Sequence, residues 1–193
     1  MTETFRAFIA IDLPESIKSF LSEAQEALKL YGFRVKWVRP QSIHLTLKFL
    51  GDIATADTDK IAKAMTLAAR GCPIVSLTAK GIGVFPNVRR PRVIWAGLNG
   101  RLEILANLQQ TLDAHLADLG FPRETRAFKS HLTLGRVKGK IDPARIKAAI
   151  DKLKEFESGS FEINQVILFK SELRPTGAVY TRVHAVALRG KQI

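Results

Sequence analysis

The chain has 193 residues, of which 46% are hydrophobic and 25% are charged, so a disordered or fibrous protein is excluded. The 30 Lys and Arg outnumber the 18 Asp and Glu, giving a net charge of +12 that is spread over both halves of the chain. Such an excess favours an anionic partner, without choosing between nucleic acid, nucleotide and membrane surface. The single cysteine, Cys72, excludes an intramolecular disulfide and a cysteine-based metal cluster, and we expect it to be a small buried filler.

Alternating strand-like and helix-like segments follow one another along the chain. In chain order we expect a strand at 5–13, a helix at 14–31, a strand at 43–50, a helix at 57–70, strands at 74–85 and 92–98, a helix at 100–119, a strand at 128–137, a helix from 142 to about 156, and closing strands at 161–171 and 178–188 around a turn at 174–177. Asp142 is the expected N-cap of the fourth helix, with Pro143 at its first position.

This element order predicts an α+β fold with antiparallel strands and no internal domain boundary. The first residues show no signal peptide, and no apolar run approaches the ~20 residues that a membrane span needs. We therefore expect a cytoplasmic protein.

The tetrapeptide His-Leu-Thr-Leu occurs twice, at 44–47 and at 131–134. On a β-strand, alternate side chains share a face, so the His and Thr of each copy face one way and the leucines face the other. The leucine face is suited to burial. Two such strands brought together would place two imidazoles and two hydroxyls in one cleft.

In-line displacement at phosphorus calls for this set of groups. A histidine with an ordinary pKa of about 6.5 can act as base or acid near neutral pH, so one copy can activate the nucleophile while the other protonates the leaving group. The threonine hydroxyls can donate to phosphoryl oxygens. The alternative interpretation is two ordinary half-buried strands, which fits one copy better than two.

Other catalytic patterns are not supported. Histidines 87 residues apart form no zinc motif, and no Walker A loop, GxGxxG motif or nucleophile elbow occurs, so we expect neither a metal nor a cofactor. His115, in a leucine-rich helix, and His184, in the last strand, have no recurring partner pattern, and we expect structural roles for both.

At these motifs the sequence resembles the 2H phosphoesterases, and within them the RNA 2′,3′-cyclic phosphodiesterases, historically called 2′-5′ RNA ligases. Ser130 stands where that family's second motif commonly has Pro. The resemblance covers nearly the whole chain and rests on the segments 6–11, 13–14, 37–40, 44–51, 85–86, 92–95, 130–136 and 171–173, with Gly177 and Tyr180.

The resemblance implies one bilobal domain over residues 1–193, with two pseudo-two-fold-related lobes, one motif per lobe, antiparallel sheets lining a central cleft and helices outside. It implies hydrolysis of a 2′,3′-cyclic phosphate RNA end to a 2′-phosphomonoester without metal, with His44 as the proton donor and His131 as the proton acceptor. It also implies that Thr46, Thr133 and Arg136 contact the phosphate. We expect a monomer that binds RNA or a related nucleotide.

Strict alternation disagrees with part of this assignment. It places Arg136 on the leucine face, unless a bulge permitted by Gly135 re-aims it or its long side chain reaches round the strand end. It places Lys48 on the face of His44, although lysines at strand ends are usually only solvated. Further residues have two open interpretations. The basic loop residues could grip RNA or be solvated, and the aromatics could stack a base or pack in the core: Arg89, Arg90, Arg92, Trp37, Phe85 and Trp95.

Three alternatives to hydrolysis of an RNA end also stay open. The same site run in reverse would join a 2′,3′-cyclic phosphate end to a 5′-hydroxyl without ATP. The motifs could instead only bind RNA ends, although binding alone could use Lys or Arg in place of histidine. A small cyclic phosphate derived from a nucleotide could also be the substrate.

Overall fold

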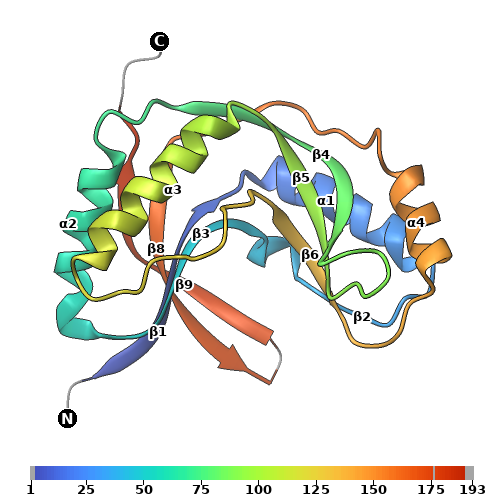
Figure 1. Cartoon of the computed structure of the whole chain (residues 1–193), viewed down its shortest axis with the longest axis horizontal. Coiled ribbons are helices and arrows are strands. Elements are labelled where there is room, and N and C mark those ends of the chain that lie inside the picture. Colours follow the sequence, from blue (N-terminus) through green and yellow to red (C-terminus); the bar gives the residue numbers. More distant parts are fainter. Residues whose placement is uncertain (1–2, 176, 190–193) are drawn as a thin grey trace.

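The computed structural model describes residues 3–175 and 177–189, whose strands form two antiparallel sheets (Figure 1). One sheet has the order β3-β1-β8-β9 and the other the order β2-β6-β5-β4-β7. The strands are β1 (Thr4–Asp12), β2 (Val35–Trp37), β3 (His44–Ala54), β4 (Val75–Phe85), β5 (Val93–Gly100), β6 (Leu132–Val137), β7 (Phe161–Ile163), β8 (Gln165–Arg174) and β9 (Gly177–Ala187). The α+β class with antiparallel pairing is confirmed.

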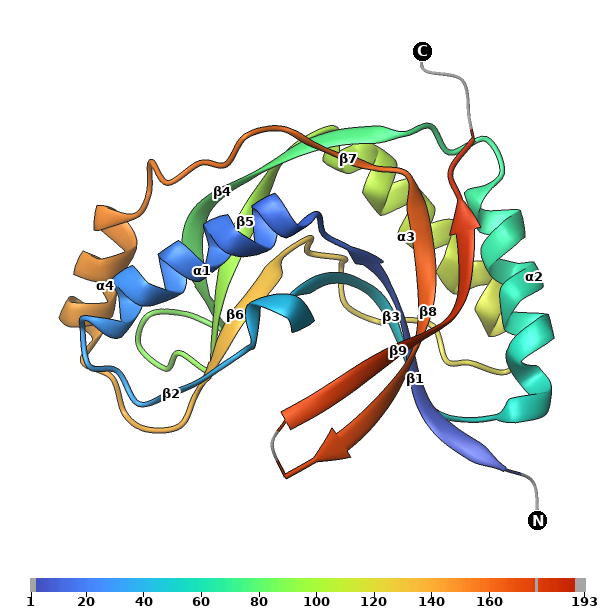
Figure 2. The ribbon, with the colours of Figure 1, turned by 180° about the vertical axis from the view of Figure 1, so that it is seen from behind.

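The helices lie on the outer sides of the two sheets (Figures 1 and 2). They are α1 (Glu15–Lys29), α2 (Thr58–Ala69), α3 (Leu102–Ala117) and α4 (Pro143–Lys152). Helices α2 and α3 pack together beside the four-stranded sheet, whereas α1 and α4 lie beside the five-stranded one. Asp142 caps α4 as expected, since its Oδ1 accepts from the backbone N–H of Ala144 at 2.7 Å.

The chain passes repeatedly from one sheet to the other. Helix α1 follows β1 of the four-stranded sheet, yet it is fixed to the five-stranded one, where Gln25 Nε2 donates to the carbonyl oxygens of Val38 and Leu134. Helix α3 follows β5 and crosses in the opposite direction. One continuous apolar core, with buried leucines such as Leu45 and Leu132 from both motifs, therefore joins the two sheets.

Three expected strands differ from the observed ones. The strand expected at 161–171 divides at Asn164, and its parts β7 and β8 enter different sheets. Strand β3 continues through Gly51, where we expected it to end. Gly51 has φ +74° beside a bulge in the pairing with β1, a conformation that glycine adopts readily, and pairing resumes beyond it. Residues 128–131 are irregular, and β6 begins only at Leu132.

Short elements were not expected. The three-residue strand β2 and the 3₁₀ turns at Pro40–Ser42 and Thr55–Asp57 are too short to show a period in the sequence. The expected turn at 174–177 includes Thr176, which lies outside the described residues. Cys72 is buried as expected, and no helix in residues 3–175 or 177–189 is long and apolar enough to cross a membrane.

Candidate active site

The two His-Leu-Thr-Leu motifs begin neighbouring strands of different sheets. His44 is the first residue of β3, and His131 immediately precedes β6. These two strands approach each other in the middle of the molecule, although they are not hydrogen-bonded partners (Figures 1 and 2). Each sheet therefore contributes one copy of the motif.

Both imidazoles are fixed in the same way. Nδ1 of His44 lies 2.8 Å from the carbonyl oxygen of Ser42, and Nδ1 of His131 lies 2.6 Å from that of Lys129. A carbonyl oxygen can only accept, so Nδ1 carries the proton in both rings. The other nitrogen, Nε2, has no hydrogen-bond partner among the described residues and can give or take a proton.

A bulge follows the threonine in each motif. In β3, Thr46 is opposite Ala10 and Lys48 is opposite Ile9, so Leu47 is an extra residue. In β6, Thr133 is opposite Trp95 and Gly135 is opposite Ile94, so Leu134 is the extra residue. An extra residue reverses the alternation beyond it, and the two copies thus share this irregularity as well as their sequence.

The bulge in β6 turns Arg136 to the face of Thr133. Arg136 is opposite Val93, which lies two residues from Trp95 on β5 and therefore on the same face. The guanidinium is exposed and has no acidic partner among the described residues. A bulge, the first of the two possibilities considered for Arg136, is therefore present with Leu134 as its extra residue, and it removes the disagreement between strand alternation and the phosphate-contact assignment.

The bulge in β3 has the opposite consequence for Lys48, which was expected on the face of His44. Lys48 is instead buried, and its Nζ lies 2.5 Å from Asp113 Oδ1 of α3 and 2.5 Å from the carbonyl oxygen of Pro122. Asp113 Oδ2 also accepts from the backbone N–H of Glu124 at 3.0 Å. Lys48 therefore holds the segment that leads to His131.

Phe49 takes the position on β3 that Arg136 has on β6. Phe49 was not among the site residues expected from the sequence. It is 59% exposed and lies opposite Phe8, with the ring centroids 6.2 Å apart. The repeat itself contains the signal, because aligning the two tetrapeptides places Phe49 over Arg136. The site thus offers an apolar ring on one strand and a cation on the other.

His44 stands on a small aromatic cluster. Its ring stacks on Phe8 at 4.7 Å between centroids and meets the edge of Tyr180 at 5.3 Å. Phe169 also stacks on Phe8, with the centroids 5.3 Å apart. Burial lowers the pKa of His44 below its ordinary value, and the Lys18 ammonium acts in the same direction, against the Ser42 hydrogen bond and the Asp12 carboxylate.

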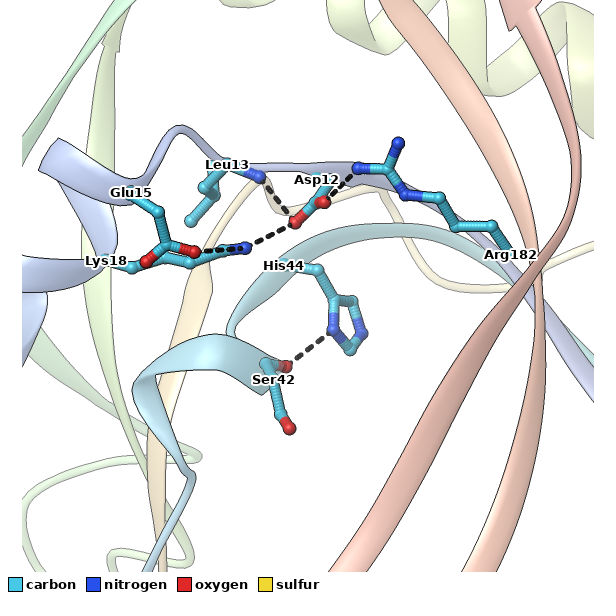
Figure 3. A network of polar contacts seen from close by, with 7 residues as sticks. All are labelled: Asp12, Leu13, Glu15, Lys18, Ser42, His44 and Arg182. Carbon is cyan, nitrogen blue, oxygen red and sulfur yellow. Dashed lines mark hydrogen bonds and ion pairs between the residues drawn. The ribbon is translucent and has the colours of Figure 1, made fainter.

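The Asp12 carboxylate lies beside His44 but is occupied by other donors (Figure 3). Lys18 Nζ lies 3.0 Å from one oxygen and Arg182 Nη2 lies 2.5 Å from the other. Burial alone would raise the pKa of Asp12, but these hydrogen bonds hold it below its ordinary value. Asp12 therefore acts on His44 as a fixed negative charge and makes no hydrogen bond to it.

Tyr180 on β9 interacts with residues of both motifs. Burial raises the pKa of its phenol, and Arg136 and Arg6 oppose that shift. Tyr180 also meets the edge of the His44 ring, so this phenol contacts the first motif and feels the charge of Arg136 from the second. The hydroxyls of Thr46 and Thr133 are half-buried and have no hydrogen-bond partner in the described part of the chain.

Of the aromatic candidates, Phe85 lies at the site, where its ring meets His131 edge-on at 5.0 Å. The ring centroids of Trp95 and Phe85 are 5.0 Å apart, and the Trp95 ring covers Gly83. The buried Nε1 of Trp95 has no hydrogen-bond partner in the described residues. Trp37 packs instead on the other side of the sheet, against the position where Gly135 has no side chain.

The remaining candidates lie elsewhere. Arg89, Arg90 and Arg92 are exposed between β4 and β5, and Asn87 accepts from the backbone of the first two. His115 lies in α3, and His184 lies on β9 opposite Leu168 of β8. Neither ring contacts a residue of the two motifs. Within residues 3–175 and 177–189 no three His, Cys, Asp or Glu side chains are grouped to hold a metal ion.

Fold and site together define a two-histidine phosphoesterase, and comparisons agree with this class. The family model described as LigT like Phosphoesterase matches residues 11–95 and 100–180. The chain is 37% identical over 183 residues to an RNA 2′,3′-cyclic phosphodiesterase of Methanothermobacter thermautotrophicus, covering 95% of this chain and 98% of that protein. The chain therefore belongs to the LigT-like phosphoesterase family.

Solved structures have the same fold. A crystal structure of a Thermus thermophilus protein superposes with a TM-score of 0.79 at 28% identity, covering 97% of this chain and 100% of that one. Escherichia coli LigT complexed with 3′-AMP has a TM-score of 0.71 at 25% identity, with 96% and 99% coverage. The resemblance implied by the motifs is thus confirmed for family and fold.

Proposed function

We propose that this protein hydrolyses the 2′,3′-cyclic phosphate at an RNA 3′ end to a 2′-phosphomonoester by acid–base catalysis between its two histidines. The protein is an RNA 2′,3′-cyclic phosphodiesterase, the activity for which its relatives are named. The observation that carries the mechanism is the matched anchoring of both rings through Nδ1, which leaves two Nε2 atoms for proton transfer.

In this mechanism His131 Nε2 takes a proton from water as the water oxygen attacks phosphorus. The bond from phosphorus to the 3′ oxygen breaks, and His44 Nε2–H donates its proton to that oxygen. His44 ends neutral and His131 ends protonated, and exchange with solvent restores both. The chemistry needs two opposed proton transfers, and no step requires a metal ion or cofactor.

The other residues of the motifs suit the phosphate. Hydroxyl donors from Thr46 and Thr133 and the exposed guanidinium of Arg136 can stabilise the charge that develops on the non-bridging oxygens. Phe49 can stack on the terminal base, since its exposed ring lies on the face of His44. A relative complexed with 3′-AMP supports a nucleoside monophosphate in such a site.

The alternative ligation reaction uses the same groups. When a 5′-hydroxyl replaces water as the nucleophile, loss of the 3′ oxygen yields a 2′-5′ linkage without ATP. We also propose that the protein is cytoplasmic, as expected from its sequence, and that it acts as a monomer, because one chain supplies both histidines. Sedimentation at assay concentration measures the mass, and activity confined to a dimer would contradict this.

The direct test uses a short RNA with a 2′,3′-cyclic phosphate, incubated with enzyme and EDTA, followed by mapping of the product end. We expect a 2′-phosphate at an unchanged rate in EDTA. A 3′-phosphate would mean that the 2′ oxygen leaves, and would contradict the proposed geometry. RNA that is bound but never cleaved would favour the binding module, and cleavage restricted to cyclic mononucleotides would favour a small-molecule substrate.

A further inference from the structure

Two pairs of like charges face each other across β2 and β6. Lys36 is directly opposite Arg136 in the antiparallel register. The pairing continues beyond the strand ends, where the backbone N–H of Lys138 donates to the carbonyl oxygen of Arg34 at 2.8 Å. We call Arg34, Lys36 and Lys138 the basic ladder, which continues the row of cations from Arg136.

The charges of the ladder are not balanced by ion pairs within the described part of the chain. All three side chains are exposed, and none has an ion pair or side-chain hydrogen bond with the described residues. Like charges directly opposite each other on a sheet destabilise it. By contrast, the exposed lysines Lys29, Lys60 and Lys147 each pair with an acidic residue three or four positions away on the same helix or at its start, for example Lys147 with Asp151 at 2.6 Å. An anionic ligand would relieve the repulsion in the ladder.

The ladder lies on the same face of the sheet as the second motif. Val93, opposite Arg136, is also opposite Phe85, whose ring touches His131. Strand β6 begins near the middle of the molecule and runs outward with β2 beside it (Figure 2). The row of cations therefore starts at the candidate phosphate site and leads away from it.

The spacing of the row suits a polynucleotide. Successive pairs are two residues apart, or about 6.7 Å along a strand, which is comparable to the separation of neighbouring phosphates in an extended RNA strand. A 2′,3′-cyclic phosphate is the 3′ terminus, so the remaining RNA must leave the site in the 5′ direction. We propose that the basic ladder binds the backbone phosphates immediately 5′ of the reacting nucleotide.

This proposal rests on the proposed function and makes a separate prediction, namely that the enzyme distinguishes RNA from a mononucleotide. The test compares kcat/KM for a five-nucleotide RNA with a 2′,3′-cyclic phosphate and for cytidine 2′,3′-cyclic monophosphate. The variant R34Q/K138Q removes the outer pair, which is farther from the histidines. The control K63Q/R70Q removes the same types of charge from exposed positions at α2.

We expect R34Q/K138Q to lower kcat/KM for the RNA about tenfold and to leave the mononucleotide rate unchanged. The slope of log(kcat/KM) for the RNA against log salt should also fall by about 0.7 for each lost phosphate contact. R34K/K138R, which keeps both charges, and K63Q/R70Q should both behave as wild type.

Several results would overturn the proposal. An unchanged RNA rate in R34Q/K138Q, or an equal loss in K63Q/R70Q, would show that the ladder does not bind RNA. An equal loss on the mononucleotide would show that these residues act on the site itself. If the wild-type enzyme hydrolyses neither substrate, the proposed function is wrong, and so is the proposal that the basic ladder binds the RNA backbone.

Discussion

Each histidine donates through Nδ1 to the carbonyl oxygen two residues before it, so the two imidazoles present the same free nitrogen. Neither can complete the proposed reaction alone. We expect H44A and H131A each to lower kcat by about a hundred- to ten-thousand-fold with no loss of fold, and the double variant to be little worse than either. Single-turnover assays measure this, and additive losses would mean that the histidines act independently.

The environment of His44 predicts a particular pH dependence. Burial and Lys18 lower its pKa in the free enzyme, so kcat/KM should fall as the pH rises through a value below the ordinary 6.5 or so. A bound phosphodiester is negative and should raise that pKa, so the corresponding limb of kcat should lie at higher pH. Rate profiles for both constants measure the shift.

A charge-neutralising variant, D12N, supplies the control for this pH prediction. Asp12 raises the pKa of His44 electrostatically, so its loss should move the limb of kcat/KM to still lower pH. A limb that stays in place in D12N would mean that another group titrates there.

At the scale of single elements, the bulges at Leu47 and Leu134 decide which side chains reach the site. The bulge in β6 turns the exposed Arg136 to the face of Thr133. The bulge in β3 instead buries Lys48 against Asp113, whose side chain is 11% exposed. K48M should lower the free energy of unfolding by about 3–5 kcal/mol, because it leaves a buried carboxylate without its ammonium partner. Urea denaturation measures the change.

The double variant K48M/D113N tests the cause of that loss. Asp113 would then carry no charge, and its amide could still accept from the backbone N–H of Glu124. We expect part of the lost stability to return. A double variant less stable than K48M would contradict the ion-pair explanation.

Most helices and strands, and the two histidines of the site, could be predicted from the sequence. The α+β class, the four helices and most strands follow from apolar periodicity, and the paired tetrapeptide points to the histidines. Alternation failed at Lys48 because one extra residue in a strand reverses the face, and no periodicity reveals a single insertion. The division at Asn164 was missed because the strand-like patterns of Phe161–Ile163 and of the apolar run 166–169 do not show which sheet each part joins.

At the scale of the whole molecule, one apolar core connects the two sheets. Both tryptophans, Trp37 and Trp95, lie in the five-stranded sheet, so their fluorescence reports on that sheet. We expect the fluorescence and far-UV circular dichroism transitions in urea to coincide, since neither sheet keeps its core without the other. An earlier fluorescence transition would show that the five-stranded sheet unfolds separately.

The central claim is that His44 protonates the leaving 3′ oxygen while His131 deprotonates water. The measurement that tests it most directly uses RNA whose cyclic phosphate has sulfur in place of the bridging 3′ oxygen, because a thiolate leaves without protonation. We predict that H44A hydrolyses this substrate at nearly the wild-type rate, whereas H131A remains inactive. Rescue of H131A instead would reverse the two roles, and rescue of neither variant would contradict the paired acid–base mechanism.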